Sequence, residues 1–311
     1  MSNLAYIQVV RKCNQSCLFC SNPENDRILE LEQAQSQIER LSRQEKMDGV
    51  ILTGGEPTLH PRLAEIVQMV NSHGLHVRVI TNGQLTASKG FLMGLKDSGL
   101  GHIHVSVYSF QEKIQAYLSN NENSLINIKK TLENIGRIGI VCDINTVMCA
   151  QNADHLDQTI GFLIDNYPFI NHFIFNAIDP KGTRVAQNPH TIARLADLEL
   201  SLNRALEKLE TSNRTYRVER LPLCYMANFA FASTETRKIV KQEGRIVQFL
   251  DDKGEIRQER FFYSKVESCR QCSLNSICAG LFDLEAYDPK ELHAIFLDPE
   301  PIKHRILKKD K

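Results

Sequence analysis

Arg11-Lys12-Cys13-Asn14-Gln15-Ser16-Cys17-Leu18-Phe19-Cys20 is the stretch from which the rest of the chain is best understood. It directly follows Leu4–Val10, an apolar run that predicts a short buried strand. Three thiols within eight residues can reach one polynuclear centre, because cysteine sulfur holds iron–sulfur clusters. Three protein ligands leave one metal position open, as a catalytic centre requires. The residues alone therefore indicate a reactive iron–sulfur site, with Arg11 and Lys12 offsetting its negative charge.

A structural zinc site or three incidental thiols is the alternative interpretation of this loop. Zinc sites favour paired C-x2-C knuckles with a fourth ligand close by. No histidine lies between Arg11 and Cys20, so the zinc interpretation is the weaker one.

Strands and helices alternate through the first two thirds of the chain. The predicted strands are 4–10, 49–53, 76–81, 102–108, 141–148 and 172–177. The predicted helices are 29–43, 61–71, 87–97, 124–138, 154–166 and 192–209. Successive β/α units imply an α/β fold with a parallel sheet and right-handed crossovers. Periodicity does not distinguish an open, partial barrel from a flat doubly wound sheet.

The alternation is expected to stop after this region. Short strands are predicted at 217–221, 246–250 and 256–262, with Asp251-Asp252-Lys253-Gly254 as a hairpin turn between the last two. We expect residues 1–209 to form the α/β domain, and residues 210–311 a small second domain with a C-terminal tail.

A second set of cysteines lies in that C-terminal region: Cys224, Cys269, Cys272 and Cys278. Four thiolates satisfy either a closed zinc site or a complete 4Fe–4S cluster. Cys224 is the least certain member, because a cysteine beside proline can simply be buried. Cys142 and Cys149 stand apart on or beside a predicted strand, and we expect both to pack in the core.

Composition and hydropathy limit the cellular compartment and the classes of binding partner that we expect. The 311 residues carry 37 basic and 37 acidic side chains, so bulk electrostatics favours neither nucleic acid nor membrane as a partner. The first ten residues lack a secretory signal, and no apolar run is long enough to span a bilayer. A cytoplasmic location follows, where thiols stay reduced. Nine cysteines there require metal binding or catalysis as their explanation.

The spacing C-x3-C-x2-C, with Phe19 before its third cysteine, resembles the radical S-adenosylmethionine (radical SAM) superfamily over about residues 4–180. Gly54-Gly55-Glu56-Pro57 after the second strand matches that family's GGE motif, which contacts the methionyl amino group. Alone, this motif is only a turn before a helix. The resemblance implies a partial (β/α)6 TIM-like barrel. It also implies polar contacts from Ser106 and Asn145 to the SAM carboxylate and ribose.

The chemistry comes from the same resemblance. One iron of a 4Fe–4S cluster on Cys13, Cys17 and Cys20 would chelate the amino and carboxylate groups of SAM. An electron from a donor such as flavodoxin or ferredoxin would cleave the sulfonium, giving methionine and a 5′-deoxyadenosyl radical. That radical would abstract hydrogen from a substrate, which makes the protein an oxidoreductase or a peptide-modifying enzyme.

C-x2-C-x5-C followed by Gly280 resembles the auxiliary-cluster extensions called SPASM and twitch domains. Phe282 stands where a full SPASM domain has a further cysteine, so one auxiliary 4Fe–4S cluster is expected. Such enzymes act mostly on peptides or on small polar metabolites. The chain begins with the first strand, so no leader-binding module is expected.

A non-catalytic iron–sulfur or zinc protein, acting as an electron carrier or scaffold, is the alternative function. The Gly54–Pro57 motif distinguishes this alternative from a SAM-cleaving enzyme, because an electron carrier needs no SAM site. The charges of Asp179, Lys181 and Arg184, after the sixth strand, are expected to be solvated.

Overall fold

A single open sheet organises the molecule. The computed structural model describes residues 3–22 and 25–308, and within them the strand order is β7-β6-β5-β4-β3-β2-β1-β8-β9. The strands are β1 Asn3–Val10, β2 Met47–Gly54, β3 His76–Thr81, β4 His102–Ser106, β5 Val141–Met148, β6 His172–Ala177, β7 Thr215–Glu219, β8 Arg245–Gln248 and β9 Glu255–Gln258. All neighbouring pairs are parallel except β8 and β9. The predicted α/β fold with a partial, TIM-like barrel is confirmed.

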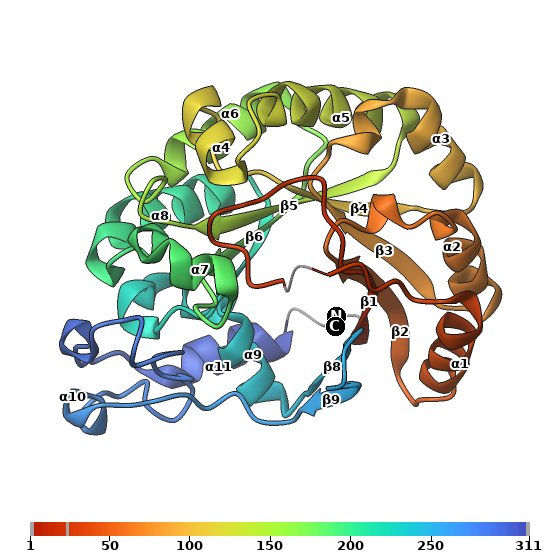
Figure 1. Cartoon of the computed structure of the whole chain (residues 1–311). Helices are drawn as coiled ribbons and strands as arrows, with labels where there is room; N and C mark the ends of the chain where they lie inside the picture. Colours follow the sequence, from red (N-terminus) through yellow and green to blue (C-terminus); the bar gives the residue numbers. More distant parts are fainter. Residues whose placement is uncertain (1–2, 23–24, 309–311) are drawn as a thin grey trace.

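Helices cover the outer side of the curved sheet (Figure 1), where α1, α2, α3, α5, α6 and α8 follow one another along an arc. The bounds are α1 Leu31–Ser42, α2 Leu63–Ser72, α3 Lys89–Asp97, α4 Glu112–Ser119, α5 Ser124–Ile138, α6 Leu156–Asn166, α7 Thr183–Gln187, α8 Leu195–Thr211, α9 Thr234–Lys241, α10 Glu267–Arg270 and α11 Pro299–Lys308. No helix within residues 3–22 and 25–308 combines the length and the apolar character needed to cross a bilayer.

The two faces of the strands differ in chemistry. Ile103 and Val105 of β4 pack in one apolar core with side chains of α5 and α6. Because successive side chains of a strand point to opposite faces, the alternate residues of β4 point to the inner side of the curved sheet. His104 and Ser106 of β4 and Asp143 of β5 belong to this inner face, and all three are buried. The inner face is therefore polar, whereas the helix-covered face is apolar.

Three strands, β7, β8 and β9, extend the sheet beyond the six strands of the predicted β/α series. β7 follows α8 and pairs in parallel with β6, so the β/α alternation continues for one more unit than the sequence indicates. β8 pairs in parallel with β1, a neighbour more than 230 residues away in sequence. The hairpin turn is confirmed, with the Phe249 N–H donating to the Gly254 carbonyl at 2.8 Å. The boundary between two domains at residues 209 and 210 stays a prediction. Strands from both sides of this boundary belong to one sheet.

Side chains join β7 and β8, which are not neighbours in the sheet. Arg245 of β8 forms an ion pair with Glu219 of β7 at 2.9 Å. The guanidinium also lies 5.5 Å from the ring centre of Tyr6 on β1 and 5.9 Å from that of Phe261. This largely buried pair links the two ends of the parallel part of the sheet.

Candidate functional site

The cysteine-bearing loop leaves the carboxyl end of β1 and returns beside it. The Arg11 N–H donates to the Arg27 carbonyl and the Leu29 N–H to the Val9 carbonyl, each at 2.9 Å. The two ends of the loop are therefore fixed to the same strand. In open parallel sheets, ligands bind beyond the carboxyl ends of the strands, which is where this loop lies.

The loop brings its three thiols together. Cys17 is buried, whereas Cys13 and Cys20 are partly exposed. The pKa of Cys17 is raised to about 12, mainly by burial and also by the Cys20 and Cys13 thiols, while a hydrogen bond with Tyr108 lowers it. Burial also raises the pKa of Cys13, with an additional contribution from Cys20. These mutual effects show that the three sulfur atoms form one group, although their role as ligands stays a proposal.

Each of the three sulfur atoms has a hydrogen-bond donor nearby. The Asn82 side-chain amide donates to Cys13 Sγ at 3.7 Å and to the Asn14 side-chain carbonyl at 2.7 Å. The Tyr108 hydroxyl lies 3.8 Å from Cys17 Sγ, and the Asn22 N–H lies 3.4 Å from Cys20 Sγ. Hydrogen bonds to sulfur are one means by which proteins tune iron–sulfur clusters. The surroundings of this group therefore suit thiolate ligands.

Gly54 and Gly55 hold the end of β2 directly against the cysteine loop. A β-carbon on Gly55 would lie 2.2 Å from the Lys12 carbonyl oxygen, and one on Gly54 would lie 2.2 Å from that of Val10. Gly54 also has a φ of +131°, which side-chain-bearing residues rarely adopt. The Gly55 N–H donates to the Val10 carbonyl at 2.6 Å, and the Glu56 N–H to the Lys12 carbonyl at 2.9 Å. The close neighbour that requires glycine here is the chain's own backbone.

Glu56 connects the ends of β2 and β3. Its side chain is 1% exposed and accepts hydrogen bonds from the Thr58 N–H and hydroxyl, the Thr81 hydroxyl and the Asn82 N–H, at 2.6–3.1 Å. Burial raises the pKa of Glu56, and these bonds oppose that rise. The Glu56 carboxylate oxygens already accept four hydrogen bonds, one of them from the Asn82 N–H. Glu56 therefore positions Asn82, whose side-chain amide donates to Cys13 Sγ.

Ser106 ends β4, and Asn145, three residues before the end of β5, lies beside it as its partner in register. Ser106 is 9% exposed, and Asn145 accepts a 2.6 Å hydrogen bond from the Asn176 amide of β6. Both belong to the inner face of the sheet, as a SAM-contacting role requires. That role stays a proposal.

Two arginines affect the electrostatics of the loop. Arg11 is 3% exposed and forms an ion pair with Asp251 of the β8–β9 turn at 2.8 Å, so its charge is not available to a cluster in the way the sequence suggests. Arg184 of α7, expected to be solvated, lowers the pKa of both Cys13 and Cys17. A β-carbon on Gly182 would lie 2.4 Å from the Ser21 α-carbon, so the segment after β6 packs against the loop.

The four C-terminal cysteines also come together. Cys224, Cys269, Cys272 and Cys278 line one pocket, together with Leu223, Leu292 and His293 among others. Burial raises the pKa of Cys224 to about 12 and raises that of Cys278. The Ile295 N–H donates to Cys272 Sγ and the Gly280 N–H to Cys278 Sγ, each at 3.4 Å. Cys224, the least certain member from sequence, is part of the group.

The remaining residues at these sites have packing roles. Phe282 stacks its ring edge-to-face with Tyr263 at 5.0 Å. Cys142 and Cys149 are buried, and Cys149 lies in the same apolar cluster as Cys17 and Tyr108.

In Figure 1, α10, which contains Cys269, lies far from the red loop that follows β1. The two cysteine groups therefore form separate sites.

Known proteins share both the sequence pattern and the fold. A sequence model of the Radical SAM superfamily matches residues 7–163, just over half of the chain. A 7,8-dihydro-6-hydroxymethylpterin dimethyltransferase of Methanocaldococcus jannaschii is 27% identical over 58% of this chain and 37% of its own length. A probable GTP 3′,8-cyclase of Sulfurisphaera tokodaii is 26% identical over 71% of this chain and 69% of its own length. The chain thus spans little more than a third of one of these relatives.

Solved structures resemble the fold over most of the chain. Streptococcus suis SuiB bound to S-adenosylmethionine superposes with a TM-score of 0.65 at 16% identity, covering 94% of this chain and 76% of SuiB. SuiB bound to its precursor peptide SuiA gives the same score and identity, covering 90% and 72%. At this identity the likeness establishes the fold.

Proposed function

The chain belongs to the radical SAM superfamily, and from that premise we propose that it is an enzyme holding a 4Fe–4S cluster on Cys13, Cys17 and Cys20, with SAM beside it. The observation that carries the proposal is the cysteine loop held against Gly54-Gly55-Glu56-Pro57 by two backbone hydrogen bonds, with no room for side chains at either glycine. The donor set fits, because three thiols in one loop can ligate a cluster and leave an iron open.

The cofactors supply the difficult chemistry: a bound cluster and SAM together provide one-electron cleavage of the sulfonium to methionine and a 5′-deoxyadenosyl radical that abstracts hydrogen. The chain's own residues position these groups. Asn82 donates toward Cys13, and the Tyr108 hydroxyl lies against Cys17. Main-chain atoms of Gly54–Pro57 are the proposed contact for the SAM amino group, because the Glu56 carboxylate is already engaged. Ser106 and Asn145 are the proposed contacts for the SAM carboxylate and ribose.

An apolar wall beside the loop supports protection of a radical. Cys17, Phe19, Tyr108, Leu118, Cys149, Ile178 and Val185 form one buried cluster. The Phe19 ring meets the Tyr108 ring edge-to-face at 4.8 Å. Such a wall excludes water from one side of the proposed site, which limits side reactions of a reactive intermediate.

For the substrate we propose a peptide or a small polar metabolite. SuiB, which shares the fold, binds a precursor peptide, and the relative from Sulfurisphaera is a probable GTP cyclase. Arg184 lies close enough to Cys13 and Cys17 to affect their pKa values, and we propose that it faces an anionic group of SAM or substrate. The electron would come from a donor such as flavodoxin or ferredoxin.

The C-terminal cysteines are proposed ligands of one auxiliary 4Fe–4S cluster of twitch type. Four thiols around one pocket satisfy a closed cluster, and backbone N–H groups point at two of the sulfur atoms. All nine cysteines are free thiols, which suits a reducing compartment, and we propose the cytoplasm on that ground.

Electron paramagnetic resonance tests the SAM site directly. The protein is reconstituted anaerobically with iron and sulfide, reduced with dithionite and measured with and without SAM. We expect SAM to change the cluster spectrum of the wild type. A Cys17→Ser variant should lose that SAM-sensitive signal while keeping an auxiliary signal. A wild-type spectrum that does not change when SAM is added would favour the electron-carrier alternative.

A further inference from the structure

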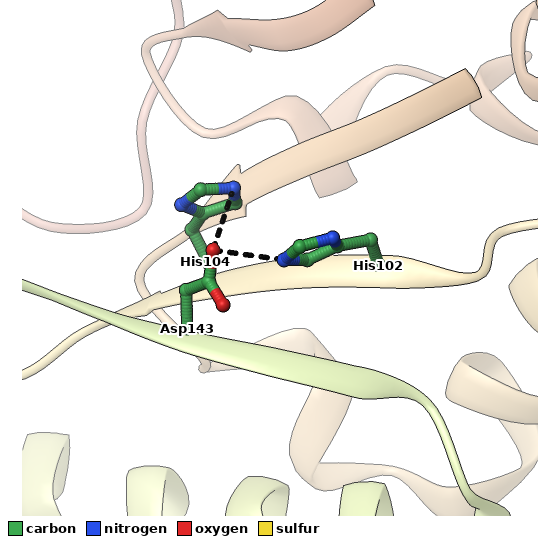
Figure 2. A group of neighbouring side chains, drawn as sticks. All are labelled: His102, His104 and Asp143. Atoms are coloured by element: carbon green, nitrogen blue, oxygen red, sulfur yellow. Dashed lines mark ion pairs between the residues drawn. The ribbon is translucent and has the colours of Figure 1, made fainter. Parts of the chain in front are cut away.

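Two histidines and an aspartate meet on the inner face of the sheet, toward the amino ends of β4 and β5 (Figure 2). His102 and His104 are two residues apart on β4 and so point to the same side, with their rings stacked at 5.1 Å and 12° apart. Asp143 of β5 is the register partner of His104. Because the cysteine loop leaves the carboxyl end of β1, this cluster lies toward the opposite end of the parallel sheet.

The spacing of these side chains suits a small metal ion. Asp143 Oδ2 lies 2.8 Å from His102 Nε2 and 3.5 Å from His104 Nε2, and one ligand atom from each residue lies within 4.8 Å of the others. A tetrahedral zinc ion with bonds of about 2.0–2.1 Å separates its ligand atoms by roughly 3.3 Å. The observed spacing brackets that value, so modest side-chain adjustment accommodates the ion.

His104 supplies an independent indication. Its side chain is 7% exposed, and Nε2 has no hydrogen-bond partner among the residues that the structure describes. Buried polar atoms normally have a hydrogen-bond partner, so an imidazole nitrogen that lies 3.5 Å from a carboxylate without forming a hydrogen bond requires an explanation.

A cavity touches the cluster at one of its members, His102. A cavity of about 320 Å³ at the amino ends of β3, β4 and β5 is lined by His102, together with Asn71, His76, Val77, Arg78, Gly99, Gly101 and Val141. One water requires only about 10–15 Å³. The cavity is therefore the side from which an ion, and a water to complete its coordination, would reach the cluster through His102.

We propose that His102, His104 and Asp143 bind one divalent transition-metal ion, of which zinc is the best fit, with water from the cavity as the fourth ligand. This site is independent of the proposed SAM chemistry. At the amino-terminal end of a barrel-like sheet, a feature typically serves stability, so the ion would tie β4 to β5 beneath the catalytic end.

The ligand atoms of His102, His104 and Asp143 restrict the kind of ion. A hard cation such as Mg²⁺ prefers oxygen ligands, whereas Zn²⁺, Co²⁺ and Ni²⁺ bind imidazole well. The site should therefore bind Zn²⁺ and Co²⁺, and it should not bind Mg²⁺ or Ca²⁺.

The test uses protein whose seven ligand cysteines already hold iron, because free thiols would also bind zinc. After equilibrium dialysis against Zn²⁺ and removal of excess metal, zinc and iron are counted by mass spectrometry. We expect one zinc per wild-type chain, and none in His104→Gln or Asp143→Asn variants with unchanged iron. His76→Gln is the matched control, because His76 lines the same cavity outside the cluster, and it should retain the zinc.

X-ray absorption at the zinc edge of the wild type makes the test independent of variant folding. The proposal predicts only nitrogen and oxygen neighbours, at about 2.0–2.2 Å. A sulfur shell near 2.3 Å, zinc retained in both cluster variants, or a wild type without zinc would each overturn it.

Discussion

Gly55 illustrates how much of the proposed site depends on single residues. Its hypothetical β-carbon would meet two backbone oxygens, those of Lys12 and Arg11, at 2.2 and 2.3 Å. Backbone atoms cannot rotate away as the end of a side chain can. The sequence motif predicts a glycine for the approach of a ligand, but only the structure shows that the cysteine loop itself takes that space. Likewise, the contact of Asn82 with Cys13 joins residues 69 positions apart, which no local pattern reveals.

Gly55→Ala should both destabilise the protein and weaken cluster loading. Overpacking of this kind costs about 1–3 kcal/mol in free energy of unfolding, and here it separates the Gly54–Pro57 turn from the cysteine loop. Gly94→Ala is the control, because Gly94 lies in α3 with open space at its β-carbon position, and alanine favours helix. Denaturant unfolding and iron counts measure both effects. Equal iron and stability in Gly55→Ala and wild type would contradict the proposed coupling.

Asn82→Asp should lower the reduction potential of the cluster proposed on Cys13, Cys17 and Cys20. The substitution keeps the shape of the side chain, but it replaces the amide that donates to Cys13 Sγ with a negative charge. Fewer donors to sulfur and more negative charge both stabilise the oxidised cluster. A redox titration followed by paramagnetic resonance measures the shift. An unchanged or raised potential would show that Asn82 does not act on the cluster.

Elements with strong periodicity were predictable, and those held by distant contacts were not. The ranges of β3, β5, β6 and α5 agree with the sequence prediction, because each carries a clear apolar pattern. No helix is predicted at α9, because its buried residues, Glu235, Thr236 and Arg237, are polar or charged and form no apolar pattern. The pairing of β8 with β1 depends on contacts across most of the chain. The His102–His104–Asp143 cluster similarly needs the register of β4 against β5.

The C-terminal cysteine pocket leads to a prediction for the elements around α10. Cys272→Ser should remove about four of about eight iron atoms per chain, if four thiols hold one auxiliary cluster. Cys142→Ser is the matched control, because Cys142 is buried in the core and outside both cysteine groups. Iron and sulfide counts after anaerobic reconstitution measure this loss in both variants. Full iron in Cys272→Ser would place the auxiliary cluster elsewhere or exclude it.

At the scale of the whole molecule, the Arg245–Glu219 pair joins the two ends of the parallel part of the sheet. The two side chains are 19% and 14% exposed, so the pair is mostly removed from water. The Arg11–Asp251 pair makes a second link, between the cysteine loop and the β8–β9 turn. The Arg11–Asp251 pair thus connects the C-terminal third of the chain with the cysteine loop of the first third.

Glu219→Gln should therefore destabilise the entire fold. It leaves a buried guanidinium without its carboxylate, and removing one partner of a buried pair costs about 3–5 kcal/mol. Glu65→Gln is the control, because the Arg62–Glu65 pair is about half exposed, and its loss should leave stability nearly unchanged. Chemical denaturation of both variants measures the difference. A small effect of Glu219→Gln would show that the two ends of the sheet hold together without this pair.

The most direct test of the central claim is the formation of 5′-deoxyadenosine. Protein loaded with iron and sulfide is incubated anaerobically with dithionite and SAM, and the products are separated by liquid chromatography. We predict 5′-deoxyadenosine and methionine from the wild type, and neither from a Cys13→Ser variant that still carries the auxiliary cluster. A fully loaded wild-type protein that forms no 5′-deoxyadenosine would contradict the assignment of this chain as a SAM-cleaving enzyme.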